Sequence, residues 1–154
     1  MKIAVGSDER NGVTQSVLAD LRSRGYEVVL FGPLAEEEGT WPVVARQVGQ
    51  AVISAEADEG VLFCWTGTGV SIAANKIGGI RAALCADAET ARGARRWNNA
   101  NVLCLSLRLT SEALAKEILE AWFSTQYEPN PEDAGCLRQL EQIELESSRG
   151  DPAS

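Results

Sequence analysis

The sequence predicts a three-layer α/β domain built around a five-stranded parallel sheet. Short apolar runs rich in β-branched residues alternate with segments of helical periodicity, and this alternation occurs five times along the 154 residues. The connections between these segments are short, as they are in compact βαβ units. Hydrophobic residues make up 45% of the chain and charged residues 23%, which is ordinary for a globular domain.

The first part of the chain begins this alternation. Residues 2–6 form a short apolar run that ends at a glycine, which predicts the first strand. Apolar residues at helical spacing follow over 11–24, and Gly25 stands where a helix commonly ends. The run 27–32 predicts the second strand. The polar stretch 33–40 that follows is expected to be a loop.

The middle of the chain repeats the pattern. A second helix is predicted to begin near Pro42, with Val44 and Val48 on its buried face. The apolar run 60–64 predicts a third strand that is covered on both faces, as interior parallel strands are. A glycine-containing loop then leads into a short predicted helix over 69–77.

Two further strand–helix units complete the predicted domain. Strands are expected at 79–85 and 101–106. The helices that follow them are expected to begin at Asp87 and at Thr110–Ser111, because these side chains are good helix N-caps.

The composition changes after the fifth unit. The α/β domain is expected to cover residues 1–127, and residues 128–154 to form a C-terminal extension. Two prolines near the start of the extension favour a segment that crosses the surface or reaches a neighbouring subunit. A last helix is predicted at about 136–147, packed on the domain or on the partner subunit.

Charge and cysteine content restrict the class of protein. A formal net charge of −8 argues against nucleic acid or an anionic membrane as a partner, since both attract basic surfaces. No apolar stretch reaches the roughly 18 residues of a membrane-spanning helix, and the amino-terminal residues resemble a strand rather than a signal peptide. The chain has four cysteines without a CxxC pair and no histidine, so we expect reduced thiols in a cytoplasmic protein without a metal site.

The end of the third predicted strand holds the first candidate site, because ligands of open α/β sheets bind beyond the carboxyl ends of strands. Gly67 and Gly69 allow backbone N–H groups to converge on an anion, although a tight turn that requires glycine is an equally good interpretation. Cys64 ends the strand and could act as a thiolate nucleophile or base, whereas most strand cysteines are only small hydrophobic residues.

Other polar residues offer acid–base groups and donors. Asp8 and Glu9 follow the first strand, where a carboxylate can pass protons between hydroxyl groups or simply cap the next helix. Asn98, Asn99 and Asn101 can donate to an oxyanion or close a helix-to-strand turn. Five arginines are candidate phosphate ligands or solvated helix charges: Arg92, Arg95, Arg96, Arg108 and Arg138.

Three segments carry a family resemblance: TGTGVSIAANK at 66–76, GIRAALC at 79–85 and NNANVL at 98–103. With them the chain resembles, over nearly its whole length, the type B ribose-5-phosphate isomerases and galactose-6-phosphate isomerase subunits. The resemblance implies a Rossmann-like domain whose five parallel strands have the order 2-1-3-5-4. It also implies a homodimer, often paired into a tetramer, whose active sites lie between two subunits.

The resemblance further implies an aldose–ketose isomerase that works on sugar phosphates through a cis-enediolate, without a metal or organic cofactor. Cys64 matches the base that moves a proton between C1 and C2. Asp8 and Thr66 match residues that assist ring opening and hydroxyl handling, and Asn98 matches a group that stabilises the enediolate. The loop backbone shares that last role, and the loop comprises Thr66, Gly67, Thr68, Gly69 and Val70.

Several positions depart from the family pattern. Glu9 and Trp97 stand where the family has histidines that serve ring opening and the phosphate end, and Trp65 replaces a glycine beside the base. Arg138, with Arg108, is expected to hold the anionic end, while the second tail arginine of the family is missing. The departures favour a substrate that needs little ring opening, such as a four-carbon aldose phosphate, with the indoles filling space or stacking on the sugar. The competing explanation is that Glu9 takes over the missing histidine's proton transfer.

Two other classes of function are considered. One is a non-catalytic sugar-phosphate binding protein that lost turnover together with the family histidines. The other is a thiol redox or nucleotide-binding flavodoxin-like protein, which fits less well because a resolving cysteine and a nucleotide fingerprint are lacking.

Overall fold

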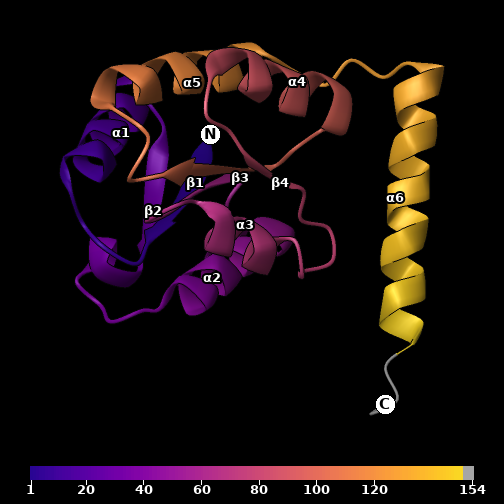
Figure 1. Ribbon diagram of the computed structural model, residues 1–154, viewed down its shortest axis with the longest axis horizontal. Helices are drawn as coiled ribbons and strands as arrows, with labels where there is room; N and C mark the ends of the chain where they lie inside the picture. Colours follow the sequence, from indigo (N-terminus) through magenta and orange to yellow (C-terminus); the bar gives the residue numbers. More distant parts are fainter. Residues whose placement is uncertain (151–154) are drawn as a thin grey trace.

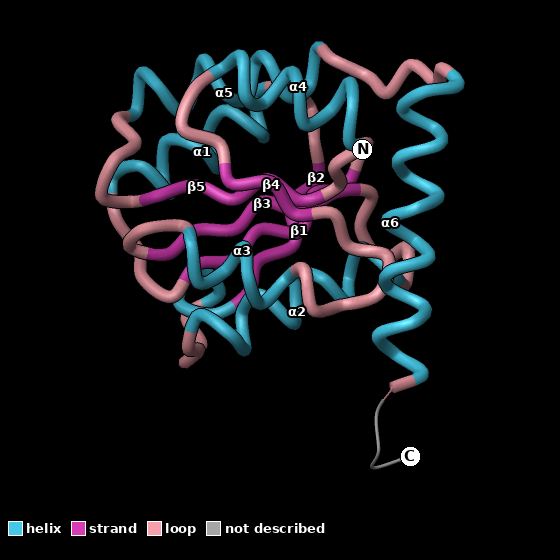
Figure 2. Tube along the Cα trace, turned by 45° about the vertical axis from the view of Figure 1, so that its right-hand side comes forward, coloured by secondary structure: helices cyan, strands magenta, loops and turns pink. Residues whose placement is uncertain are grey.

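The computed structural model describes residues 1–150 and contains a five-stranded parallel sheet in the order 2-1-3-5-4. This is the order that the resemblance implies, and Figure 2 shows the strands crossing the middle of the molecule. The strands are β1 (Lys2–Ser7), β2 (Glu27–Phe31), β3 (Glu59–Cys64), β4 (Ala82–Leu84) and β5 (Val102–Ser106).

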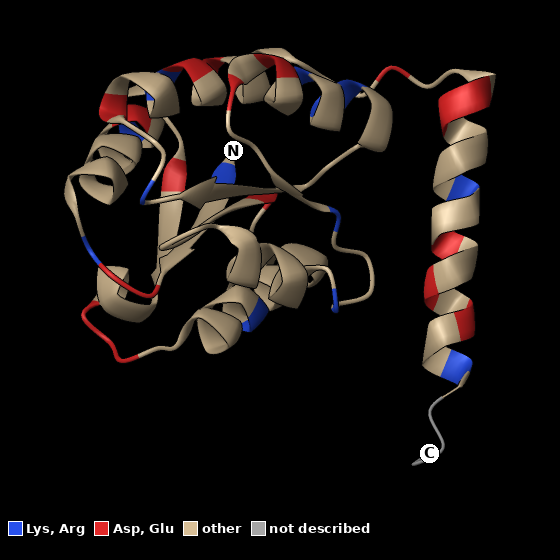
Figure 3. Ribbon diagram, viewed as in Figure 1, with Lys and Arg blue, Asp and Glu red and all other residues tan. Residues whose placement is uncertain are grey.

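Helices cover both faces of the sheet and form the predicted three layers (Figure 1). One face carries α1 (Gly12–Ser23), α4 (Ala88–Asn98) and α5 (Glu112–Ser124), and the other carries α2 (Trp41–Ile53) and α3 (Thr68–Ala74). Each face has its own hydrophobic core between helices and sheet. Charged residues lie mainly on helices and loops, while the strands are largely uncharged (Figure 3).

The predicted helix boundaries are confirmed at several positions. Asp87 and Ser111 are the N-caps of α4 and α5, and their side chains accept hydrogen bonds from backbone N–H groups three residues later. Gly25 has a φ of 80°, the left-handed conformation that ends a helix. The strand 60–64 is also confirmed as enclosed, because every residue of β3 is buried between β1 and β5.

Three predicted boundaries within the α/β domain are wrong. Part of the expected loop 33–40 belongs to a short 3₁₀ helix, η1 (Gly32–Ala35), which begins with Gly32 at a φ of 66° and Pro33 in its first turn. The helix expected over 69–77 ends at Ala74, because the N–H groups of Lys76 and Ile77 bond three residues back in tighter turns. β4 begins at Ala82 rather than 79, since a turn occupies the intervening residues.

The last helix, α6 (Pro131–Arg149), begins five residues before the predicted start at 136. Asn130 caps it and Pro131 occupies its first turn, a combination that starts a helix even in a polar segment. None of its residues is buried, and Figure 1 shows it standing beside the three layers. Of the predicted extension 128–154, residues 151–154 lie outside the described part of the chain. A helix long and apolar enough to cross a membrane is not found within residues 1–150.

Gly6→Ala should lower the free energy of unfolding, because a Cβ at Gly6 would lie 2.4 Å from Val44 Cγ1 and 2.9 Å from Val48 Cγ2. Overpacking of this kind costs about 1–3 kcal/mol. Urea denaturation measures the change, with Gly135→Ala in α6 as the matched control. A Cβ at Gly135 meets only the end of Arg138 at 3.8 Å, so helix propensity should keep that variant at or above wild-type stability. Equal stability of Gly6→Ala and wild type would contradict tight packing of α2 on the sheet.

Candidate active site

The register of the sheet brings three polar side chains together at the carboxyl ends of the central strands. Ser7 of β1 pairs with Phe63 of β3, so the next residues, Asp8 and Cys64, leave the sheet side by side. Cys64 in turn pairs with Ser106, the last residue of β5. Neighbouring strands lie about 4.8 Å apart, so a carboxyl, a thiol and a hydroxyl group follow one another across these strand ends.

Asp8 has an unusual environment for a carboxyl group. Its Oδ1 atom is buried and has no hydrogen-bond partner within residues 1–150. Desolvation raises the pKa of Asp8, and the hydrogen bond to its own backbone N–H offsets only part of that increase. Such a carboxyl group is suited to carrying a proton during a reaction.

The turn that carries Asp8 is held by Ser7. The buried Ser7 Oγ donates to the carbonyl of Glu9 at 2.6 Å and accepts from the Glu9 N–H at 3.2 Å. The Glu9 side chain is exposed at the tip of this turn. The structure therefore places Glu9 at the same edge of the sheet as Asp8, as the sequence predicts.

The backbone after Cys64 is fixed to the end of β5. Leu107 N–H donates to the Cys64 carbonyl at 3.0 Å, and Arg108 N–H donates to the Trp65 carbonyl at 2.9 Å. Ser106 Oγ donates to the same Trp65 carbonyl at 3.0 Å. The Cys64 side chain is only 5% exposed, whereas the Trp65 indole, which follows directly, is 58% exposed.

The glycine loop is a tight turn in which Gly67 is required. Gly67 has a φ of 76°, and a Cβ there would lie 2.6 Å from Leu84 Cδ1 and 3.0 Å from the carbonyl carbon of Leu105. The turn interpretation of this glycine is therefore confirmed, and it is compatible with anion binding. The first backbone hydrogen bond of α3 runs from Ser71 N–H to the Gly67 carbonyl, which leaves the N–H groups of 68–70 without an intrahelical acceptor.

The threonines of the loop lie next to a shallow depression. Thr66 Oγ1 and Thr68 Oγ1 share a hydrogen bond of 2.7 Å. Thr66 and Arg108 both line a depression of about 210 Å³, so the structure brings this arginine to the loop. The other residues of the lining are Leu84, Cys85, Ala86, Ser106 and Leu109.

Trp41 lies beside the candidate site, and sequence reasoning missed it. It is the first residue of α2, and a Cβ at Gly69 would lie 3.0 Å from its indole Cδ2 and Cε3 atoms. Gly69 is thus needed for the loop to approach an aromatic ring, and this ring is 42% exposed. The tryptophan before Pro42 was a visible signal, but helical periodicity gave no reason to place it against the loop.

Trp97 and Asn98 lie near the amino-terminal ends of the strands, opposite the end that holds Cys64. They end α4, which runs back to the side where β5 begins at Val102, the partner of Gly60 in β3. Four residue steps of about 3.3 Å separate Gly60 from Cys64, or roughly 13 Å along the strand. A single chain therefore does not bring Asn98 to Cys64. Both side chains at the end of α4 are exposed, Trp97 by 56%.

The neighbouring asparagines have structural roles. Asn99 takes the left-handed conformation at a φ of 46° and ends α4. Asn101 accepts from the Arg81 N–H at 2.8 Å and donates to the Gly79 carbonyl at 2.9 Å. The alternative that asparagines close the turn is confirmed for these two residues, by the backbone of Asn99 and by the side-chain amide of Asn101.

The structure places the candidate arginines in different environments. Arg95 forms a buried ion pair with Glu59, so its interpretation as a phosphate ligand or a solvated charge is wrong. Arg92 pairs with Glu89 on its own helix. Arg138 is exposed on α6, which contacts α4 rather than the edge that holds Cys64.

The other cysteines are unsuited to thiolate chemistry at this edge. Cys85 and Cys104 are buried as predicted, and burial raises the pKa of Cys85 to about 12 and that of Cys104 well above its ordinary value. Cys136 is exposed on α6. All four thiols are free, and no cluster of three or more potential metal ligands occurs within residues 1–150.

Asp8→Asn should raise the free energy of unfolding at neutral pH. Since the folded protein holds the Asp8 proton more tightly than the unfolded chain does, this carboxyl group lowers stability as the pH rises from its ordinary pKa through its raised pKa. The gain should vanish below the ordinary pKa, where both states carry the proton. Urea denaturation of wild type and variant between about pH 3 and pH 8 measures the difference. A variant that is less stable than wild type at neutral pH would contradict the desolvated carboxylate.

Known proteins resemble this chain in sequence and in fold. The family model described as Ribose/Galactose Isomerase matches residues 3–140. Ribose-5-phosphate isomerase B of Escherichia coli (strain K12) is 42% identical over 128 residues, which cover 82% of this chain and 86% of that protein. D-erythrulose-4-phosphate isomerase of Pectobacterium atrosepticum is 37% identical over 131 residues, which cover 83% of this chain and 86% of the relative.

The fold also matches a solved structure along nearly all of its length. The ribose-5-phosphate isomerase B of Clostridium thermocellum superposes with a TM-score of 0.89 at 37% identity, over 96% of this chain and 99% of the other. The chain therefore belongs to the Ribose/Galactose Isomerase family and is an isomerase.

Proposed function

We propose that this protein interconverts the aldose and ketose forms of a small sugar phosphate through a cis-enediolate. The observation that carries the proposal is the placement of Asp8 and Cys64 directly after the last paired residues of adjacent strands, beside a loop whose N–H groups have no intrahelical acceptor. The relatives, which are named as sugar-phosphate isomerases, support it. The alternative of a binding protein without turnover has no such observation in its favour.

In the proposed reaction, one hydrogen moves between C2 and C1 and a second moves between O2 and O1. The Cys64 thiolate takes the proton from C2 of the aldose and delivers it to C1, which converts the aldehyde carbon to a hydroxymethyl group. A hydroxyl proton moves from O2 to O1 with the help of Asp8 and Thr66. Negative charge develops on oxygen between these steps, and the N–H groups of 68–70 stabilise it. One preorganised donor of this kind lowers the barrier by about 3 kcal/mol.

The substrate is proposed to be shorter than a pentose phosphate. Trp65 and Trp97 are large where the family has a glycine and a histidine, and a four-carbon aldose phosphate leaves room for both indoles. Such a sugar cannot form a furanose through its phosphorylated oxygen, so it needs no ring-opening histidine. The relative named D-erythrulose-4-phosphate isomerase supports this size. Arg108, which lines the depression beside Thr66, is the proposed ligand of the anionic end.

The active site is proposed to be shared between two copies of the chain. Asn98 can serve the enediolate only from a second subunit, because it lies at the far edge of its own sheet. Exposed apolar side chains around the glycine loop support a second copy as their cover. These side chains are Trp41, Trp65, Ile72, Leu84 and Leu109.

The helix α6 is proposed to pack on the same partner. It exposes Leu140 by 47% and Ile143 by 63%, and these residues share one side of the helix. Burying them against a second copy removes apolar surface from water and places Arg138 where it can reach the partner's substrate. Pairing of such dimers into a tetramer remains part of the proposal.

Cys64→Ser should lose most of the isomerase activity while keeping the fold, because the hydroxyl is a much weaker base than the thiolate. A loss of about 10²- to 10⁴-fold is expected for removal of a general base. The measurement is deuterium incorporation at C1 or C2 from D₂O, across aldose and ketose phosphates of four to six carbons. Cys136→Ser, on the exposed face of α6, is the matched control and should exchange like wild type.

Two results of this experiment would contradict the proposal. Full exchange by Cys64→Ser would remove the thiol from the mechanism. Absence of exchange by wild type with every sugar, together with a higher melting temperature in their presence, would favour the binding protein. A preference for a five- or six-carbon sugar over a four-carbon one would contradict the proposed substrate size alone.

Hybrid dimers should test the shared site. A dimer of one Cys64→Ser chain and one Asn98→Ala chain contains one site with both wild-type residues, so it should recover about half of the wild-type activity. Cys64→Ser combined with Asp8→Asn is the control, because both changes affect the same half of the site and no intact site forms. The hybrids are purified through two different affinity tags. Equal activity of the two hybrids would show that Asn98 does not act across the dimer.

A further inference from the structure

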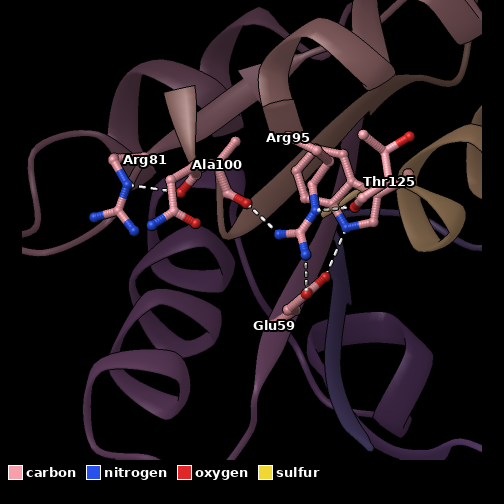
Figure 4. Close-up of polar contacts among 7 residues, drawn as sticks. Glu59, Arg81, Arg95, Ala100 and Thr125 are labelled. Atoms are coloured by element: carbon pink, nitrogen blue, oxygen red, sulfur yellow. Dashed lines mark hydrogen bonds and ion pairs between the residues drawn. The ribbon is translucent and has the colours of Figure 1, made fainter. Parts of the chain in front are cut away.

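A buried polar cluster lies at the amino-terminal end of β3, at the opposite end of the strand from Cys64 (Figure 4). Glu59 is only 8% exposed, and both of its carboxylate oxygens are used. Its Oε1 accepts from Arg95 Nη2 at 2.7 Å, and its Oε2 accepts from Trp122 Nε1 at 2.7 Å. The Arg95 guanidinium also lies 5.0 Å from the centroid of the Trp122 ring.

The same guanidinium holds two backbone carbonyls that lie outside regular structure. Arg95 Nη1 donates to the Ala100 carbonyl at 2.5 Å, and Arg95 Nε donates to the Thr125 carbonyl at 3.3 Å (Figure 4). Ala100 belongs to the turn between α4 and β5, which directly follows Asn98. Thr125 is the first residue after α5, where the chain departs toward α6.

A second arginine holds this turn from its other side. Arg81 Nε donates to the Asn99 carbonyl at 2.7 Å (Figure 4). Consecutive carbonyls of the turn, at Asn99 and Ala100, are therefore each bonded to a guanidinium group. Of these two arginines, only Arg95 is itself oriented by a buried carboxylate.

Stability alone gives little reason for a charge in this position. A buried ion pair is often no more stabilising than apolar side chains of similar size. Desolvation raises the pKa of Glu59, while the charge of Arg95 and the two N–H donors lower it, so the carboxylate depends on its partners. An apolar pair has no guanidinium group. The Glu59 carboxylate holds the Arg95 guanidinium at a fixed angle, and the remaining N–H donors of Arg95 can bond to the turn.

We propose that Glu59 is a positioning residue for the isomerisation, and that it acts through Arg95 on the turn that follows Asn98. Glu59 orients the guanidinium, the guanidinium fixes the Ala100 carbonyl, and the turn thereby fixes Trp97 and Asn98 at the end of α4. This inference rests on the proposed function, because these two side chains act in the site of a second copy. Glu59 itself contacts no substrate.

Glu59→Gln should lower kcat by about 10- to 100-fold, since an error of about 1 Å in the placement of a catalytic group has effects of this size. The amide nitrogen cannot accept a hydrogen bond, so the variant loses the bond from Arg95 or from Trp122. KM should change much less, because the loop and Arg108 belong to the other half of the site. Asp20→Asn is the matched control: it removes the negative charge from the 2.5 Å ion pair between Asp20 and Arg24, neither of which bonds to the Asn99 or Ala100 carbonyl, and should leave kcat unchanged.

Hybrid dimers distinguish action on the turn from action along the strand. Glu59→Gln paired with Cys64→Ser should recover activity, because one site then has an intact thiol and an undisturbed Asn98. Glu59→Gln paired with Asn98→Ala should not recover, because both changes affect the same contribution to the site. The reverse pattern would show that Glu59 acts on Cys64 through β3, and it would overturn the inference. Recovery in both hybrids or in neither would overturn it as well.

The hybrid of Cys64→Ser with Asn98→Ala serves as the reference. If this reference hybrid does not recover activity, the shared site and this inference are both overturned. If it recovers activity but the two Glu59→Gln hybrids do not show the expected pattern, this inference alone is overturned. Should Glu59→Gln fail to fold, Glu59→Leu combined with Arg95→Met replaces it, since apolar pairs of similar volume preserve folding. That double variant loses the donors to the Ala100 carbonyl and should show the same recovery pattern; recovery with Asn98→Ala instead would overturn the inference.

Discussion

The parallel pairing of β3 with β1 and β5 is the constraint on which the rest of the molecule depends. Because both edges and both faces of β3 are covered, its first and last side chains have very little access to water. Glu59 at its start therefore needs internal hydrogen-bond partners, and it finds them on α4 and α5. Cys64 at its end is 5% exposed and packs in the core beneath α2 and α3, at the carboxyl ends of the strands, where ligands of such sheets bind.

Parallel topology also explains why a single chain does not bring Asn98 to Cys64. Each helix must run back across the sheet before the next parallel strand can begin. Residues that end the strands therefore lie at the carboxyl ends of the sheet's strands, and residues that end the helices lie at the amino-terminal ends. Cys64 belongs to the first kind and Asn98 to the second. A second subunit can bring the two edges together without any change in the fold.

The carboxyl ends of the strands, where Cys64 lies, carry several features that do not contribute to folding stability. Asp8 has a buried oxygen without a partner within residues 1–150, and Gly67 occupies a left-handed conformation against the backbone of β5. Large apolar side chains such as Trp65 are exposed beside them. A buried carboxyl oxygen without a partner and exposed indoles beside it are typical of a site that is shaped for binding and reaction rather than for stability.

Local patterns in the sequence determined the strand–helix order, the caps at Asp87 and Ser111 and the turn at Gly67, because each depends on residues within a few positions. The start of α6 was missed because a cap and a proline outweighed a segment without apolar periodicity. Only the tertiary structure decided that Glu59 meets partners 36 and 63 positions away, and that Trp41 packs on the loop. These contacts depend on where the crossovers bring distant segments, and no local pattern of residues records that.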